Sequence, residues 1–166
     1  MRTLIYILMG IFTFLIQADV LPMLFRQGWI PNLILVWVIV LSLLKGRRIG
    51  LMAAITGGLV HDILISNSFG LHLFPYIAVA YIVSIWSFSV YEEQWYITFA
   101  WVSVGTLADI IFRIGMLWLG REDILVGSYL WHHIWPVWWL NGLLGIMIHE
   151  ILWNMEVERR IYLVVN

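Results

Sequence analysis

The chain has 166 residues, of which 63% are hydrophobic and only 11% are charged, and its formal net charge is −1. A soluble domain has roughly 45–50% apolar and about 25% charged residues, so this composition excludes a water-soluble enzyme, a disordered protein and a nucleic-acid-binding protein. The absence of cysteine excludes disulfides and thiolate nucleophiles. Because a spanning helix needs about 20 apolar residues, we expect one integral membrane domain over residues 1–166.

The gaps between charged residues predict where helices cross the membrane. Span 1 is expected over residues 4–23, retained rather than cleaved as a signal peptide. Span 2 is expected over residues 29–44, with Pro31 in its first turn, where a missing N–H is harmless. The basic segment 45–48 then forms the turn that leads into span 3, over residues 49–65.

The second half of the chain continues this pattern with three longer apolar runs. Span 4 is expected over residues 71–91, and span 5 over residues 95–119. Span 6 lies within residues 125–153, with Pro136 near its start or at a kink, and a short charged tail follows from Asn154. The sequence therefore predicts an all-α, polytopic membrane protein with six transmembrane helices and short loops.

The distribution of basic residues predicts the orientation of this bundle. Six spans place both termini on the same side of the membrane. With the termini in the cytoplasm, the basic residues outside the spans divide into a large inner group and a small outer group. The inner group is Arg2, Lys45, Arg47, Arg48, Arg159 and Arg160, and the outer group is Arg26 and Arg121. The positive-inside rule therefore favours termini on the cytoplasmic side of the membrane.

Small residues line one face of span 3. Gly50, Ala54, Gly58 and Asp62 recur at intervals of four residues, so they share a helix face, and small residues allow another helix to approach closely. This face either packs inside the protein or docks the transmembrane helix of a partner. A carboxylate is costly in hydrocarbon, so we expect Asp62 either to cap the following turn or pair with a neighbour, or to form a functional polar site. The neighbouring His61 is expected to point in a different direction.

Two further charged residues lie inside span 5. Asp109 and Arg113 are one helical turn apart, so they can pair on one helix face. The pairing lowers the free-energy cost of placing each charge in the bilayer. The pair is either a structural ion pair or part of a polar centre shared with Asp62 or with a partner.

The remaining histidines predict no metal site. The adjacent His132 and His133 suit anchoring at the membrane interface better than metal binding. A zinc-protease helix would need a second histidine four residues after His149, where the chain has tryptophan. We find no nucleophile elbow, phosphate-binding loop or dinucleotide fingerprint, so the sequence predicts neither catalysis nor a cofactor.

A succession of short motifs between residues 31 and 81 resembles the MreD family of bacterial rod shape-determining membrane proteins. The order is a Pro-Asn pair before an apolar run, a basic turn, a glycine-spaced helix, an aspartate, a glycine-containing turn and a tyrosine. These elements are Pro31, Asn32, residues 45–48, Gly50, Gly58, Asp62, Gly70 and Tyr81. Asp109 resembles a later acidic position of the family, and Asn141-Gly142 in the last span also fits.

The resemblance implies a non-enzymatic inner-membrane component of the cell-elongation machinery. Proteins of this family work with MreC, a bitopic protein with a periplasmic domain, in an assembly that includes MreB filaments, the glycosyltransferase RodA and its partner transpeptidase. Their fold is similar to the six-helix substrate-binding subunits of energy-coupling-factor transporters. The resemblance therefore implies membrane lipid and an MreC-like protein as partners.

Two functional hypotheses follow. The first is a scaffold that binds an MreC-like partner and helps couple MreB filaments to peptidoglycan synthesis and cell shape. The alternative is a small-solute-binding transporter subunit in which Asp62, Asp109 and Arg113 line a cavity open to the outside. Because intramembrane charges often mark pathways, the alternative predicts a water-filled pocket with convergent polar groups.

Overall fold

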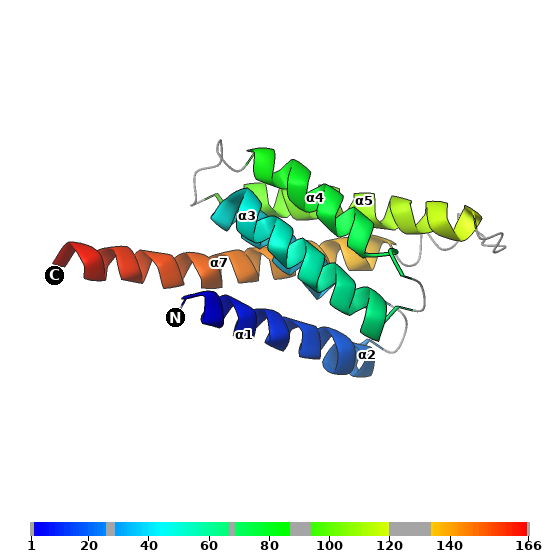
Figure 1. Cartoon of the computed structure of the whole chain (residues 1–166), viewed down its shortest axis with the longest axis horizontal. Coiled ribbons are helices and arrows are strands. Elements are labelled where there is room, and N and C mark those ends of the chain that lie inside the picture. The colour runs from blue at the N-terminus through cyan, green and yellow to red at the C-terminus, as the bar shows by residue number, and fades with distance from the viewer. Residues whose placement is uncertain (1, 26–28, 67–68, 87–93, 120–133, 166) are drawn as a thin grey trace.

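The computed structural model describes residues 2–25, 29–66, 69–86, 94–119 and 134–165, and helices are the only regular secondary structure within these ranges. This confirms the predicted all-α class. Figure 1 shows the helices packed side by side in a bundle. In chain order they are α1 (Arg2–Leu15), the π-helix η1 (Ile16–Val20), α2 (Leu21–Leu24), α3 (Leu33–Leu64), α4 (Leu73–Trp86), α5 (Trp95–Leu119) and α7 (Trp135–Val165).

The first three helices form one continuous rod, which coincides with the predicted span over residues 4–23. The residues on either side of η1, Leu15 and Leu21, both have right-handed helical dihedral angles, so the rod does not break there. Pro22 lies in the first turn of α2. Because proline lacks an N–H and clashes with the preceding turn, the wider π-turn before it lets the rod continue. The π-turn also carries the buried side chain of Gln17.

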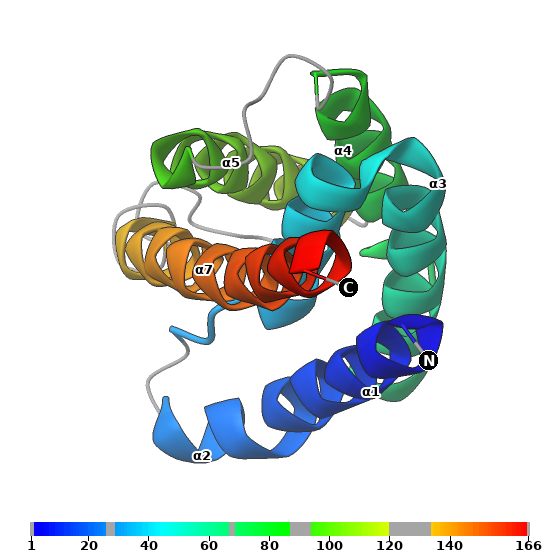
Figure 2. The same cartoon turned by 90° about the vertical axis from the view of Figure 1, so that its left-hand side faces the viewer.

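The helix α3 consists of two arms that fold back on each other at Gly46. Gly46 has φ 76° and ψ −174°, a conformation in which glycine avoids the steric cost of a side chain. A Cβ atom built on Gly50 would lie 2.7 Å from Cα of Ser42, and one on Gly57 would lie 2.9 Å from Cγ2 of Ile34. These contacts make the arms an antiparallel hairpin, seen in Figure 2, and they place the predicted turn of residues 45–48 between two helical segments.

The first arm of α3 is the central helix of the bundle. Every residue from Leu33 to Leu43 is buried, and α3 contacts α1, α4, α5 and α7. An arm over residues 33–45 is about 20 Å long, shorter than the ~30 Å hydrocarbon core of a bilayer. Because Asn32 and Leu33 at its start are buried, this central arm begins inside the protein rather than at its surface.

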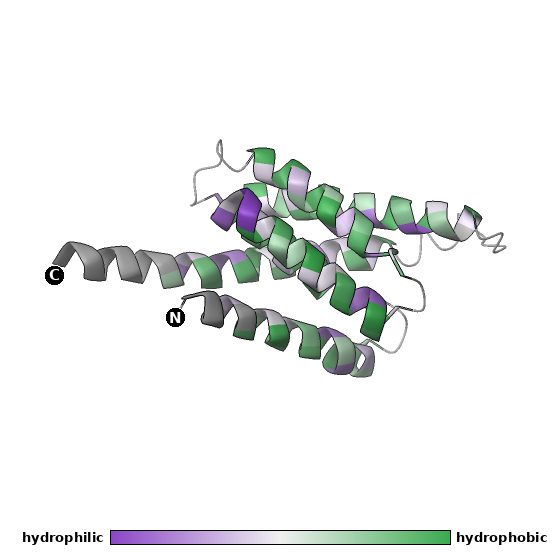
Figure 3. Cartoon of the chain, in the orientation of Figure 1, coloured by the Kyte–Doolittle hydropathy of each residue, from purple (hydrophilic) through white to green (hydrophobic). Residues whose placement is uncertain are grey.

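The outward surface of the bundle is apolar, as the green outer faces in Figure 3 show. Large exposed side chains include Phe12 on α1, Ile85 on α4 and Ile111 on α5. By length and composition, one helix in the described ranges, Trp95–Met116, is long and apolar enough to cross a membrane, and Leu8–Leu24 and Leu73–Trp86 are apolar but shorter. Contiguous apolar surface of this kind marks contact with lipid or with another protein.

One predicted detail at a helix start is wrong. Asn32 is the N-cap of α3, and its side chain accepts a hydrogen bond from the N–H of Leu35; Pro31 therefore precedes the helix instead of lying in its first turn. The predicted charged tail from Asn154 is part of α7, which continues to Val165. The charges of this segment end the apolar run without ending the helix.

The other predicted boundaries agree more closely. The helix α5 has the predicted bounds, and Pro136 is the second residue of α7, where proline is compatible with a helix start. The helix α4 lies inside the predicted range 71–91, of which residues 87–91 fall outside the described residues.

Candidate functional site

The buried start of α3 creates a need for polar partners. The first N–H groups of a helix have no acceptor within the helix, and in a protein interior each unpaired group is costly. The backbone N–H of Asn32 donates to Oδ1 of Asn141 at 2.8 Å, and that of Leu33 donates to Oε1 of Gln17 at 2.6 Å. Oδ1 of Asn32 accepts from the N–H of Leu35 at 3.1 Å. Side chains from η1 and α7 therefore complete the start of the central arm.

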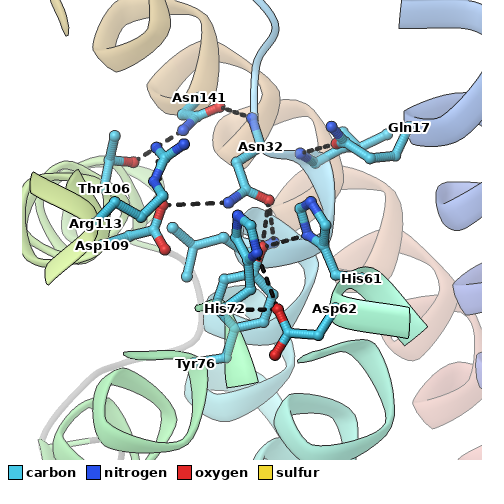
Figure 4. A network of polar contacts seen from close by, with 12 residues as sticks. Gln17, Asn32, His61, Asp62, His72, Tyr76, Thr106, Asp109, Arg113 and Asn141 are labelled. Atoms are coloured by element: carbon cyan, nitrogen blue, oxygen red, sulfur yellow. Dashed lines mark hydrogen bonds and ion pairs between the residues drawn. The ribbon is translucent and has the colours of Figure 1, made fainter. Parts of the chain in front are cut away.

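Asn32 is also the centre of a wider set of side-chain contacts (Figure 4). Its Oδ1 accepts from the hydroxyl of Tyr76 at 2.7 Å, and its Nδ2 donates to Oδ2 of Asp109 at 3.4 Å. Asn141 extends the set, because its Nδ2 donates to Oγ1 of Thr106 at 3.0 Å. We call the connected residues the polar junction. They are Gln17, Asn32, His61, Asp62, His72, Tyr76, Thr106, Asp109, Arg113 and Asn141.

Asp62 fastens the turn between α3 and α4. Its carboxylate accepts backbone hydrogen bonds from Gly70 at 2.8 Å, His72 at 2.9 Å and Leu73 at 3.1 Å, and it lies 3.1 Å from Nδ1 of His72. Gly70 has φ 92°, which favours glycine. A carboxylate at the first N–H groups of α4 also interacts favourably with the helix dipole, so Asp62 closes the turn and caps α4.

His61 and Asp62 have different hydrogen-bond partners, but both contact His72. His61 stacks on the ring of His72, with centroids 3.8 Å apart and planes 7° apart, and Asp62 bonds the same His72. Nδ1 of His61 lies 2.8 Å from the Tyr76 hydroxyl. Because that hydroxyl donates its hydrogen to Asn32, Nδ1 of His61 is the donor in this contact. Adjacent residues on α3 therefore meet in one site through His72.

Asp109 and Arg113 form an ion pair through a single contact. Nη2 of Arg113 lies 3.1 Å from Oδ2 of Asp109, and the exposed side-chain fractions are 29% and 1% respectively. Among the described residues, Oδ1 of Asp109 and Nε of Arg113 are buried without a hydrogen-bond partner. Asp62 connects to Asp109 only indirectly, through the stacked histidines, Tyr76 and Asn32.

The small-residue face of α3 lies inside the chain. Gly50, Ala54 and Gly58 are buried. A Cβ atom on Gly58 would lie 2.7 Å from Cα of Leu73, so α4 covers this part of the face, while Ser42 of the first arm covers Gly50. The protein's own helices occupy the face that could have docked a partner.

The other residues singled out in the sequence lie apart from the polar junction or flank it. Pro31 is buried directly before Asn32. Tyr81 is 42% exposed and lies beyond the junction on α4, beside Arg47. His149 forms a second contact between α7 and α5, with Nδ1 2.7 Å from Oγ1 of Thr98. His132 and His133 lie outside the described residues.

Sequence reasoning missed Gln17, His72, Tyr76 and Thr106 of the polar junction, whereas Asn32 and Asn141 entered through the family resemblance. Gln17 and Thr106 are polar residues inside apolar runs, and Tyr76 and His72 lie near the start of the predicted fourth span. Polar residues in membrane helices face the bundle interior, so a search for uncharged as well as charged groups would have found them. The pairing of these residues over long sequence distances has no local signal.

The geometry of the polar junction suits holding the helices in place better than catalysing a reaction. Its hydrogen bonds join η1, both arms of α3, α4, α5 and α7, so they tie these elements to one another. In the described ranges, no group of three or more His, Cys, Asp or Glu side chains could hold a metal ion.

The Tyr76→Phe variant tests this fixation. The change removes one hydroxyl, which leaves Oδ1 of Asn32 and Nδ1 of His61 short of a partner, so we expect a loss of about 1–3 kcal/mol in unfolding free energy. Thermal unfolding in detergent measures the effect. Tyr96→Phe on the exposed surface of α5 is the matched control; equal melting of the two variants would contradict the proposed role of Tyr76.

Comparison with known families covers nearly the whole chain. A family model described as rod shape-determining protein MreD matches residues 1–155. Searches of curated proteins and of solved structures found no match. The matched range extends from α1 into α7 and includes every residue of the polar junction.

Proposed function

Because the chain belongs to the MreD family of rod shape-determining proteins, we propose that it is an integral membrane scaffold of the cell-elongation complex, without enzymatic activity. The family match over residues 1–155 is the observation that carries this proposal. The contacts of the polar junction support it, because the polar groups in the bundle bind the protein's own backbone and side chains.

The proposed membrane arrangement has six spans. These are the rod of α1, η1 and α2, the two arms of α3, and the helices α4, α5 and α7. Figure 1 supports cytoplasmic termini, because α1 begins and α7 ends toward the same end of the bundle as the basic turn of α3. The buried start of the first arm suits this placement, because non-helical backbone at membrane depth is tolerated where protein surrounds it. We further propose that the fold is similar to energy-coupling-factor substrate-binding subunits.

The proposed partner is an MreC-like bitopic membrane protein, within an assembly that also contains MreB, RodA and its partner transpeptidase. With short loops, recognition occurs largely inside the bilayer, where packing and interhelical hydrogen bonds drive association. Since Gly50 and Gly58 already contact the chain's own residues, a partner helix would bind the outward faces. The polar junction would keep the outward faces of the helices fixed relative to one another, as a scaffold requires.

The contacts of the charged residues favour a scaffold over a solute-binding transporter subunit. The residue Asp62 is only 4% exposed, and its carboxylate accepts three backbone hydrogen bonds. Asp109 is 1% exposed and pairs with Arg113. Groups that bind a solute need unused hydrogen-bonding capacity facing a cavity. Asp62 is engaged within the protein, and the two unpartnered atoms of the ion pair, Oδ1 of Asp109 and Nε of Arg113, are buried.

Copurification and depletion together test the scaffold proposal. We expect the affinity-tagged chain, solubilised from membranes of a rod-shaped host, to retain the MreC-like partner, and we expect depletion of the chain to convert rods into round cells. An unrelated bitopic membrane protein of similar abundance is the control for nonspecific retention. Absence of the complex together with unchanged cell shape would contradict the proposal.

A further inference from the structure

The turn between the two arms of α3 carries three basic residues around a glycine. Lys45 is half-buried, and Arg47 and Arg48 are exposed. No atom lies within 4 Å of the position that a Cβ on Gly46 would occupy, so the turn projects from the bundle. Figure 3 shows a hydrophilic patch at this end of α3, next to the apolar faces of the helices.

Aromatic rings from two neighbouring helices hold two of these cations. Nζ of Lys45 lies 5.3 Å from the ring centroid of Tyr6 on α1, and Cζ of Arg47 lies 4.7 Å from that of Tyr81 on α4. A cation over an aromatic face at such a distance is attracted by the ring quadrupole. The two rings therefore hold the basic turn between α1 and α4, and they give Tyr81 a role outside the polar junction.

The exposed charges have the chemistry of a phosphate site. Among the described residues, neither Arg47 nor Arg48 forms an ion pair with a carboxylate. A planar guanidinium matches the oxygens of a phosphate through two parallel hydrogen bonds. On the same two helices, exposed apolar side chains such as Met52 on α3 and Ile82 and Ile85 on α4 offer a surface for acyl chains.

We propose that the basic turn of residues 45–48, together with Tyr81, binds the headgroup phosphate of an anionic phospholipid. The proposal rests on the membrane placement given under the proposed function, and it is independent of any protein partner. Charge complementarity selects this occupant, because cytoplasmic leaflets carry anionic lipids that attract basic segments at membrane surfaces. The apolar side chains on the same two helices match the remainder of a lipid better than an acidic protein segment.

Reconstitution of the purified full chain tests the proposal. Nanodiscs of phosphatidylcholine alone are compared with nanodiscs that also contain phosphatidylglycerol, by melting temperature and by native mass spectrometry of retained lipid. We expect phosphatidylglycerol to raise the melting temperature and to remain bound. In the Arg47→Gln/Arg48→Gln variant, phosphatidylglycerol should no longer raise the melting temperature. Binding of the retained phosphatidylglycerol should be about fivefold weaker for each arginine removed. Both side chains are exposed, so this variant should fold.

Conservative variants separate the charge from the ring. Arg47→Lys should keep part of the lipid effect, Tyr81→Phe should keep it almost fully, and Tyr81→Leu should reduce it, because phenylalanine retains the aromatic face and leucine does not. Equal stabilisation of the wild-type chain and the double glutamine variant by phosphatidylglycerol would overturn the proposal, as would no stabilisation of the wild type. Stabilisation by inorganic phosphate in phosphatidylcholine alone would assign the site to free phosphate instead. None of these results depends on recovery of an MreC-like partner.

Discussion

The Asp62→Ala variant is expected to lose about 3–5 kcal/mol of unfolding free energy, because a buried charged acceptor disappears and leaves its donors unpaired. The N–H groups of Gly70, His72 and Leu73 would have no replacement acceptor, and Nδ1 of His72 would lose its contact. The turn between α3 and α4 and the N-terminus of α4 would both loosen, so the change should act on the fold rather than on one helix end.

Thermal unfolding in detergent and the yield of monodisperse protein measure this effect. Asp62→Asn should be less damaging, because the amide retains one acceptor oxygen. Asp19→Ala is the matched control, because Asp19 is an exposed carboxylate on η1 and its removal should change stability by less than about 0.5 kcal/mol. If Asp62→Ala melts together with Asp19→Ala, the carboxylate does not fasten this turn.

The Gly58→Leu variant is expected to destabilise the chain by about 3 kcal/mol, near the upper end of overpacking effects. The added Cβ would lie 2.7 Å from Cα and 3.3 Å from the backbone N of Leu73. A backbone atom cannot move aside as a flexible side chain can, so the second arm of α3 and α4 would have to separate. Asp62 lies one turn further along the same face, so its contacts should weaken as well.

A second glycine gives the control for this experiment. A Cβ on Gly115 of α5 would have no atom within 4 Å, so Gly115→Leu adds the same side chain without a clash and increases helix propensity. We expect Gly115→Leu to melt at or above the wild-type temperature and Gly58→Ala to melt between the wild type and Gly58→Leu. A small effect of Gly58→Leu, similar to that of Gly115→Leu, would show that the contact with Leu73 is looser than described.

Local patterns in the sequence predicted the features that depend on neighbouring residues. The bounds of α5 follow from the charges and polar residues that flank one apolar run. The spacing of Asp109 and Arg113 placed them on one helix face, where the structure has their ion pair. The basic segment 45–48 predicted a turn because several charges together are costly inside hydrocarbon. In each case the physical cause lies within a few residues of the feature.

The polar junction depended instead on tertiary structure. Asn32 and Asn141 are 109 residues apart, and Asn32 and Tyr76 are 44 apart, so no periodicity relates them. The meeting of His61 and Asp62 at His72 had no local signal for the same reason: the two side chains diverge on the helix, but His72 from the following turn lies against both. The charged tail from Asn154 belongs to α7, because a helix can continue beyond the apolar run that marks a span.

The contact between Asn141 and the backbone of Asn32 also has a consequence for biogenesis. The acceptor that completes the start of the central arm belongs to α7, which is synthesised after α1 to α5. Earlier segments can therefore enter the membrane, but the amide of Asn32 has its native partner only after α7 arrives. A product truncated before α7 would keep that amide without this partner, so the start of the central arm would stay incomplete until α7 is made.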